Sequence, residues 1–169
     1  MGLKRLFIDL PALIASGVPA EQIECEYMFH RTNSGTLSLL EVAEFAAYCR
    51  QCKDAFCVIA CPREALERQE NGVIKRFNMR CVGCKSCVLA CPFGTIFPEV
   101  INYVTAKCDV CLNQRRDHPD YVPACVKTAP PGTFAIKEVP QEDPQNHIYF
   151  AGEQVAIKSP SWRHKEQQE

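Results

Sequence analysis

The chain has 169 residues, and its 19 basic and 20 acidic residues leave a net charge of −1, which lacks the basic excess typical of nucleic-acid-binding proteins. No stretch approaches the ~18 consecutive apolar residues of a membrane span, and the N-terminus carries neither an apolar signal region nor a twin arginine. Twelve cysteines are the unusual feature of the composition. We therefore expect a cytoplasmic protein whose cysteines bind metal rather than form disulfides.

The N-terminal third is predicted to contain one strand and one helix. Residues 3–10, LKRLFIDL, have the composition of a short β-strand. No cysteine follows until Cys25, which stands alone. Residues 36–48 carry apolar side chains at helical spacing, and Ser38 with Glu41 has the pattern of a capping box, so we expect a helix there.

Two complete cysteine motifs follow this helix. Residues 49–62 read C-x2-C-x4-C-x3-C-P, and residues 81–92, CVGCKSCVLACP, read C-x2-C-x2-C-x3-C-P. The second spacing is the one with which bacterial ferredoxins hold [4Fe–4S] clusters: three thiolates bind one cubane and the fourth binds a second. The segment between the motifs has a turn at Asn71 and Gly72 before a strand-like VIKRF, which indicates a hairpin.

A third set of cysteines is incomplete. Cys108 and Cys111 follow the run FGTIFPEVINYVTAK, expected to be extended, and a polar insertion separates them from Cys125. The earlier spacing puts the next cysteine at position 129, before Pro130, but that residue is Ala129. Laid backwards from Cys25, the spacing of residues 49–62 places three further lost cysteines at Leu13, Ser16 and Glu21.

The twelve cysteines divide into three sets of four if the loops pair as they do in two-cluster ferredoxins. The predicted ligand sets are Cys49, Cys52, Cys57 and Cys91; Cys61, Cys81, Cys84 and Cys87; and Cys25, Cys108, Cys111 and Cys125. A fourth cluster would need thiols at the four positions that have lost them. The pattern therefore predicts three [4Fe–4S] clusters with no cysteine left over.

With LFIDL ahead of them, these motifs resemble the multi-cluster electron-transfer subunits of molybdenum and tungsten oxidoreductases and hydrogenases, over about residues 3–140. The phrases PREAL, NMRCVGCKSC and CPFGTI are similar to the small iron–sulfur subunits that accompany tungsten enzymes of the aldehyde:ferredoxin oxidoreductase type, such as class II benzoyl-CoA reductase. This resemblance implies an electron-transfer subunit that is not an enzyme by itself.

The resemblance also implies partners. Single electrons would pass along three clusters in a row, between a catalytic tungsten or molybdenum subunit and a further redox subunit or ferredoxin, in a hetero-oligomer. The cluster of Cys25 would then be terminal and face the catalytic subunit.

The expected fold class is α+β. A pseudo-symmetric bacterial ferredoxin-like core over residues 49–92 would lie inside a second, degenerate ferredoxin-like half, with short strands and short helices around the clusters. Residues 1–150 are expected to form this polyferredoxin-like domain, and residues 151–169 a C-terminal extension. Further strands are expected at IYF, residues 148–150, and within EQVAIK, residues 153–158.

Other functions compete with this interpretation. A zinc-binding module would explain the C-x2-C pairs but leaves the remaining cysteines of the two complete motifs without a role. An enzyme with its own substrate is disfavoured because the three ligand sets leave no free thiol and no open iron. Within electron transfer, a freestanding diffusible polyferredoxin and a hydrogenase subunit remain open.

Overall fold

The computed structural model describes residues 4–30, 33–70, 72–96, 98, 101, 108–151 and 153–160. The first elements are β1 (Lys4–Asp9), α1 (Leu10–Ser16), the 3-10 helix η1 (Ala20–Gln22), β2 (Met28–His30), β3 (Asn33–Ser34) and α2 (Gly35–Ala47). The middle of the chain forms α3 (Phe56–Ile59), β4 (Leu66–Arg68), β5 (Ile74–Arg76) and α4 (Ser86–Ala90). Last come α5 (Leu112–Asp117), α6 (Ala124–Thr128), β6 (Phe134–Glu138), η2 (Pro144–Asn146), β7 (Ile148–Phe150) and β8 (Val155–Lys158). These elements confirm the α+β class.

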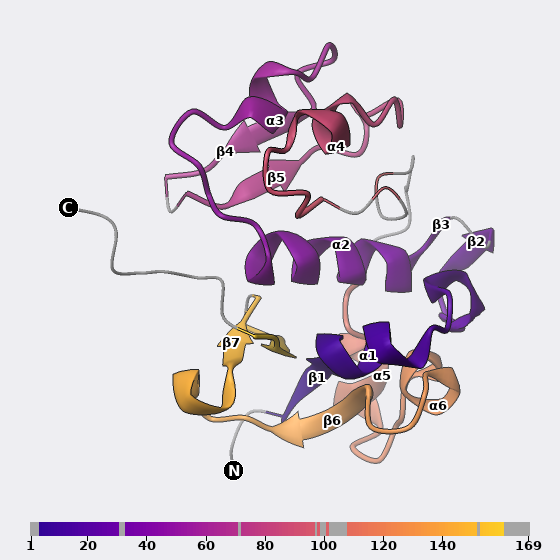
Figure 1. Ribbon diagram of the computed structural model, residues 1–169. Coiled ribbons are helices and arrows are strands. Elements are labelled where there is room, and N and C mark those ends of the chain that lie inside the picture. The colour runs from indigo at the N-terminus through magenta and orange to yellow at the C-terminus, as the bar shows by residue number, and fades with distance from the viewer. Residues whose placement is uncertain are drawn as a thin grey trace.

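One half of the molecule, drawn at the bottom of Figure 1, is built on a four-stranded sheet. Its strand order is β6-β1-β8-β7, in which β1 pairs antiparallel with β6 and parallel with β8. Side chains on both faces of β1 are buried, among them Leu6, Phe7 and Ile8, as expected of a strand covered on both sides. The strand predicted at residues 3–10 is thus confirmed as the centre of this sheet.

The C-terminal strands complete the same sheet. The strands expected at residues 148–150 and 153–158 are present as β7 and β8, which are hydrogen bonded to each other in antiparallel register. The boundary expected after residue 150 therefore falls between two paired strands, and β8 continues the sheet by joining β1. Residues 161–169, the rest of the expected extension, lie outside the described residues.

The other half contains the two complete cysteine motifs (top of Figure 1). Short helices α3 and α4 each begin after a residue in the left-handed region, Ala55 at φ 34° and Lys85 at φ 63°. The predicted hairpin is the antiparallel pair β4–β5, with Gly72 at φ 81° in its turn. Asn71 and most of the run expected to be extended before Cys108 lie outside the described residues.

Helix α2 lies between the two halves and is buried on nearly all sides (Figure 1). Leu40 and Ala43 join the apolar core beside the sheet. Phe45 joins the core of the half that contains the two complete cysteine motifs, which we call the ferredoxin-like half. The predicted helix at residues 36–48 is confirmed, but the expected capping box is wrong. Ser34 caps the helix by accepting the N–H of Leu37 at 3.3 Å, because Ser38 lies inside the helix, where it has no free N–H group to cap.

Among the helices of the described segments, none has both the length and the apolar character needed to cross a membrane.

We predict that Ile157→Ala lowers the free energy of unfolding by about 2–5 kcal/mol, the usual cost of truncating a buried isoleucine. Ile157 is 1% exposed and pairs with Ile8 in the centre of the sheet. Anaerobic urea unfolding followed by circular dichroism would measure the loss, with exposed Val42→Ala as the control. An unchanged midpoint would show that β8 is an appendage and not part of the core.

Candidate metal centres

Four cysteines of the ferredoxin-like half surround one pocket. Cys61, Cys81, Cys84 and Cys87 all line it, together with Arg76 and apolar side chains such as Leu66 and Ile101. We call these four the second cysteine group. The chain brings Cys61, the last cysteine of one motif, to the first three cysteines of the other. This is the combination that the ferredoxin pairing predicts.

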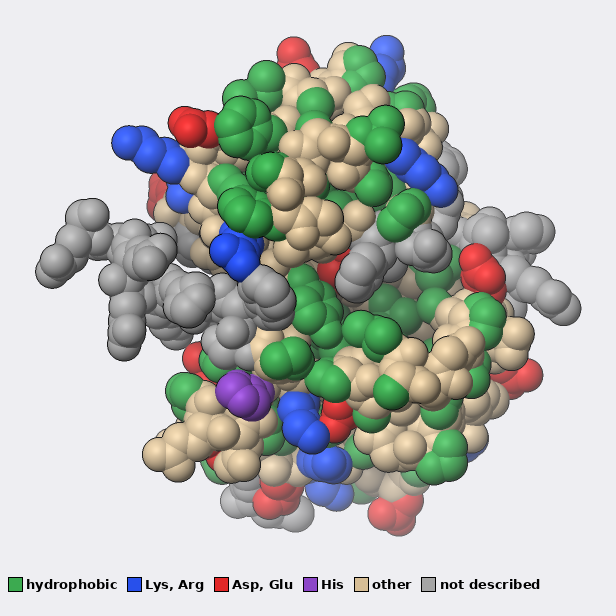
Figure 2. All heavy atoms as spheres, in the orientation of Figure 1, with side chains coloured by type: hydrophobic (Ala, Val, Ile, Leu, Met, Phe, Trp, Pro, Cys, Tyr) green, Lys and Arg blue, Asp and Glu red, His purple; other side chains and the backbone are tan. Residues whose placement is uncertain are grey.

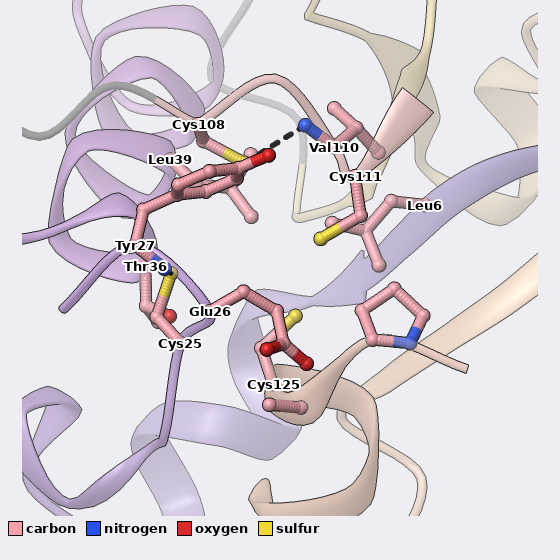
Figure 3. A pocket seen from close by; sticks show the side chains of 12 residues that line it. Leu6, Cys25, Glu26, Tyr27, Thr36, Leu39, Cys108, Val110, Cys111 and Cys125 are labelled. Carbon is pink, nitrogen blue, oxygen red and sulfur yellow. Dashed lines mark hydrogen bonds between the residues drawn. The ribbon is translucent and has the colours of Figure 1, made fainter. Parts of the chain in front are cut away.

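A second pocket, in the sheet-bearing half, is lined by Cys25, Cys108, Cys111 and Cys125, which we call the third cysteine group. Its empty space is about 330 Å³, part of it open solvent. Figure 3 shows the four sulfur atoms around this space, brought there by the segment before β2, the loop before α5 and helix α6. Cys25 is 83 residues from the next member of the group, and only the tertiary fold joins them.

The remaining four cysteines form the first cysteine group: Cys49, Cys52, Cys57 and Cys91. Burial raises the pKa of the Cys49 thiol, and the charges of nearby Cys52 and Cys91 raise it further. Burial raises the pKa of Cys57 to about 11, with smaller contributions from Cys49 and Cys91. Cys49 is therefore within electrostatic reach of Cys52, Cys57 and Cys91, although Cys57 is also affected by Cys87 of the second group, so the first ligand set stays a prediction.

The loops that carry these thiols share a backbone feature. The N–H two residues beyond a cysteine donates to its sulfur at four places: Tyr27 to Cys25 at 3.4 Å, Gln51 to Cys49 at 3.4 Å, Gly83 to Cys81 at 3.4 Å and Val110 to Cys108 at 3.3 Å. Gln51, Gly83 and Val110 have φ of 53°, 69° and 59°. The left-handed conformation turns the N–H toward the sulfur, where it can stabilise a thiolate.

Without a cation nearby, the buried thiols of the third group favour the protonated state. Burial raises the pKa of Cys108 to about 11 and that of Cys125 to about 12, and nearby cysteines add to both shifts. Iron binds thiolates, so four such groups can ionise together only beside a compensating cation. In the described part of the chain, no three His, Cys, Asp or Glu side chains are placed to hold one metal ion. The ligands of a cubane bind four separate irons and stand further apart.

Polar side chains that the sequence did not single out surround the third group. Tyr27 donates from its hydroxyl to Asp109 at 3.1 Å and accepts from the Gln114 amide at 3.3 Å. The Tyr121 hydroxyl donates to Glu26 at 2.7 Å, and Glu26 lines the pocket. These bonds tie the Cys25 segment to the loops of Cys108 and Cys125. No spacing rule could have identified them.

The second group has a buried cation beside it. Burial alone would lower the pKa of Arg76, but hydrogen bonds and charge attraction from Glu41 and from Cys81 raise it above its ordinary value. Arg76 Nε donates to Glu41 Oε1 at 2.7 Å, and a second contact joins the same two side chains. Sequence analysis missed this ion pair because 35 residues separate its partners.

The positions of the lost fourth set have other structural roles. Leu13 is buried in α1, the Ser16 hydroxyl donates to the Leu13 carbonyl at 2.6 Å, and Glu21 is exposed in η1. Ala129 packs against the core beside Cys125. Gly132, three residues after Ala129, has φ 80°, as Glu64 and Gly94 have positive φ three residues after Cys61 and Cys91. The turn persists at Ala129 although the thiol is absent.

Comparison with known proteins agrees with this geometry. A profile of the family described as "4Fe-4S dicluster domain" matches residues 40–139, a range that contains every cysteine except Cys25. The "iron-sulfur protein" of Rhodospirillum rubrum is 41% identical over 101 residues, which are 54% of this chain and 52% of that protein. The "putative electron transport protein YsaA" of Escherichia coli K12 is 42% identical over 106 residues, 60% and 61% of the two chains.

A third relative is the "thiosulfate reductase electron transfer subunit PhsB" of Salmonella typhi, 39% identical over 89 residues, or 53% of this chain and 45% of that protein. The chain thus spans about half the length of the curated relatives it matches, and 61% at most among these three. The named functions of these relatives are iron–sulfur and electron transport functions.

We predict that Gly35→Ala disrupts the third group alone. A Cβ at Gly35 would lie 2.9 Å from the Cys25 sulfur and 3.6 Å from the Cys108 Cα, so the sulfur must move. Elsewhere in a helix this change favours folding by about 1 kcal/mol. We expect anaerobically purified protein to lose about four irons per chain, the content of one cubane. Val42→Ala on the exposed side of the same helix is the control; equal iron in both variants would contradict the prediction.

Proposed function

Because the chain belongs to the 4Fe-4S dicluster domain family, we propose that it carries three [4Fe–4S] clusters and relays single electrons between a catalytic oxidoreductase subunit and another redox partner. The observation that supports this proposal is the gathering of eight of the twelve thiols around two pockets, four at each, from separate segments of the chain. A [4Fe–4S] cluster supplies reversible one-electron transfer when bound.

The residues of the chain would contribute binding, insulation and charge. The thiolates of each group would hold the irons, and the N–H groups of Tyr27, Gln51, Gly83 and Val110 point at ligand sulfurs. Val58 and Val88, between consecutive ligands, pack partly buried against the core and limit the access of water. Sulfur hydrogen bonding and solvent exclusion are the features by which proteins set cluster potentials.

The surface over α3 and α4 supports a docking role in electron exchange. Ile59 on α3 and Leu89 on α4 are 74% and 89% exposed, although each lies between two predicted ligands. Figure 2 shows hydrophobic side chains on this half of the molecule, with Lys and Arg side chains at its edges. An exposed apolar surface so close to the predicted ligands is what a redox partner needs in order to approach.

For the catalytic partner we propose a tungsten or molybdenum subunit, on the strength of the sequence resemblance to the small subunits of such enzymes. The name of PhsB, an electron transfer subunit of a reductase, supports a hetero-oligomer of this general kind. Anaerobic co-purification from the native source, with analysis for iron, tungsten and molybdenum, tests this assignment. Recovery of the chain alone, fully loaded and active with soluble acceptors, would instead favour a freestanding polyferredoxin.

We predict that the anaerobically purified chain contains about twelve irons and twelve acid-labile sulfides, because each of three cubanes holds four of each. Iron and sulfide analysis per chain measures this directly. Ala129→Cys should leave the content at about twelve, since Leu13, Ser16 and Glu21 still cannot ligate iron as thiolates. A value near sixteen irons in either protein would mean that the fourth site has been wrongly judged lost.

We also predict that Cys25→Ser removes or alters one cluster and leaves the other two intact. The third group lies across α2 from the other two, and we propose that it is the end of the row that faces the catalytic subunit. Electron exchange with that subunit should therefore slow far more than exchange with a small dye. Unchanged iron content and intersubunit rate would show that Cys25 is only a partly buried thiol.

A further inference from the structure

The ion pair between Arg76 on β5 and Glu41 on α2 is deeply buried. The side chains of Arg76 and Glu41 are 0% and 8% exposed, against 44% or more for at least one partner in the other two ion pairs. Burying two charges is costly, and replacing such a pair by apolar groups often stabilises a protein. A role in stability alone is therefore a weak explanation for it.

The positive member of the ion pair, Arg76, lies on the side of the second cysteine group, and the negative member lies behind it on α2. Arg76 lines the pocket of the second cysteine group together with Cys81, and its guanidinium hydrogen bonds Glu41. Glu41 holds the guanidinium through two contacts from α2. The positive member of the pair thus lies at the pocket of the predicted ligands.

The third group has the opposite electrostatic surroundings. Its pocket is lined by Glu26, and the residues described as lining it include no Lys or Arg. Asp109 lies between Cys108 and Cys111 in the chain, and its Oδ1 accepts the backbone N–H of Cys111 at 2.8 Å. The two groups therefore differ in the sign of the charge nearest to their sulfurs.

We propose that the Arg76–Glu41 pair raises the reduction potential of a cluster held by Cys61, Cys81, Cys84 and Cys87 above that of a cluster held by Cys25, Cys108, Cys111 and Cys125. The proposal rests on the proposed function, which supplies the clusters. One-electron reduction adds one negative charge to a cluster and requires no bond to form or break. A buried cation that lines the pocket of the ligands stabilises the reduced form, and its burial limits screening by salt.

If the pair sets the reduction potential, two variants should shift that potential in opposite directions, which a purely structural contact would not cause. Arg76→Gln removes the cation and leaves the carboxylate, so the potential of one cluster should fall. Glu41→Gln keeps the cation and removes the opposing charge, so the same potential should rise. Loss of a structural contact would instead weaken the fold in both variants. The double variant, with two neutral amides, should lie between the single variants.

Anaerobic protein-film voltammetry on the fully loaded chain, with electron paramagnetic resonance at each poised potential, tests the inference. We expect the potential of one of the three reduction steps to fall in Arg76→Gln, while the other two stay unchanged. The fall should be at least tenfold in the equilibrium constant, which is about 59 mV for one electron. Arg80→Gln is the matched control, because Arg80 adjoins Cys81 in sequence but is exposed and contacts the Phe77 ring at 5.0 Å. The reduction potentials of Arg80→Gln should equal those of the unmodified chain within the error of the measurement.

Iron content and circular dichroism establish loading and folding first. If Arg76→Gln does not retain its clusters, Glu41→Gln and Arg76→Lys, which keep the buried cation, carry the test. A loaded Glu41→Gln protein whose step is unchanged or lower contradicts the proposal, as does an equal shift in Arg80→Gln. Fewer than three clusters in the unmodified chain would contradict the proposed function. Three clusters whose reduction potentials do not change in the Arg76 and Glu41 variants would contradict this inference only.

Discussion

Helix α2 is the element on which the rest of the structure depends, because each cysteine group is fixed to a different part of it. Its first residue, Gly35, lies against Cys25 and Cys108 of the third group. Glu41 near its middle reaches the second group through Arg76, and Cys49 of the first group follows two residues after its end. The burial of α2 by both apolar cores holds these contacts together, so the spacing of the groups follows from the packing of one helix.

Packing alone cannot stabilise ionised thiols, so the structure also needs hydrogen-bond donors and a cation near them. Apolar surroundings raise the pKa of most of the buried cysteines, and the members of a group repel one another once ionised. Left-handed turns that direct N–H groups at sulfur, and the guanidinium of Arg76, supply positive partners inside an otherwise apolar environment. Differences in these partners give chemically identical ligand sets unequal surroundings, and such surroundings are what set the potential of a bound cluster.

The main core makes use of two of the four positions at which the spacing predicts absent thiols. Where a cysteine loop could stand, Asp9 caps α1 through the N–H of Ala12, Gly17 ends the helix at φ 65°, and Leu13 is buried. The turn after Ala129 keeps a left-handed residue at Gly132. A vacant cluster site would leave a cavity, and filling it with a capped helix and a leucine restores packing.

Sequence alone determined the parts that depend on local pattern. The cysteine spacings predicted three sets of four, of which two line a pocket each, and local patterns predicted β1, α2, the β4–β5 hairpin, β7 and β8. Tertiary structure decided what joins residues far apart: β8 lies inside the sheet beside β1, Gly35 touches Cys25, and Glu41 meets Arg76 at Cys81. Spacing encodes which thiols one loop can offer to a cluster. The charges beside the third group, Glu26 and Asp109, adjoin Cys25 and Cys108 in sequence, whereas Arg76 beside the second group is held by Glu41, 35 residues away, a contact that no local pattern records.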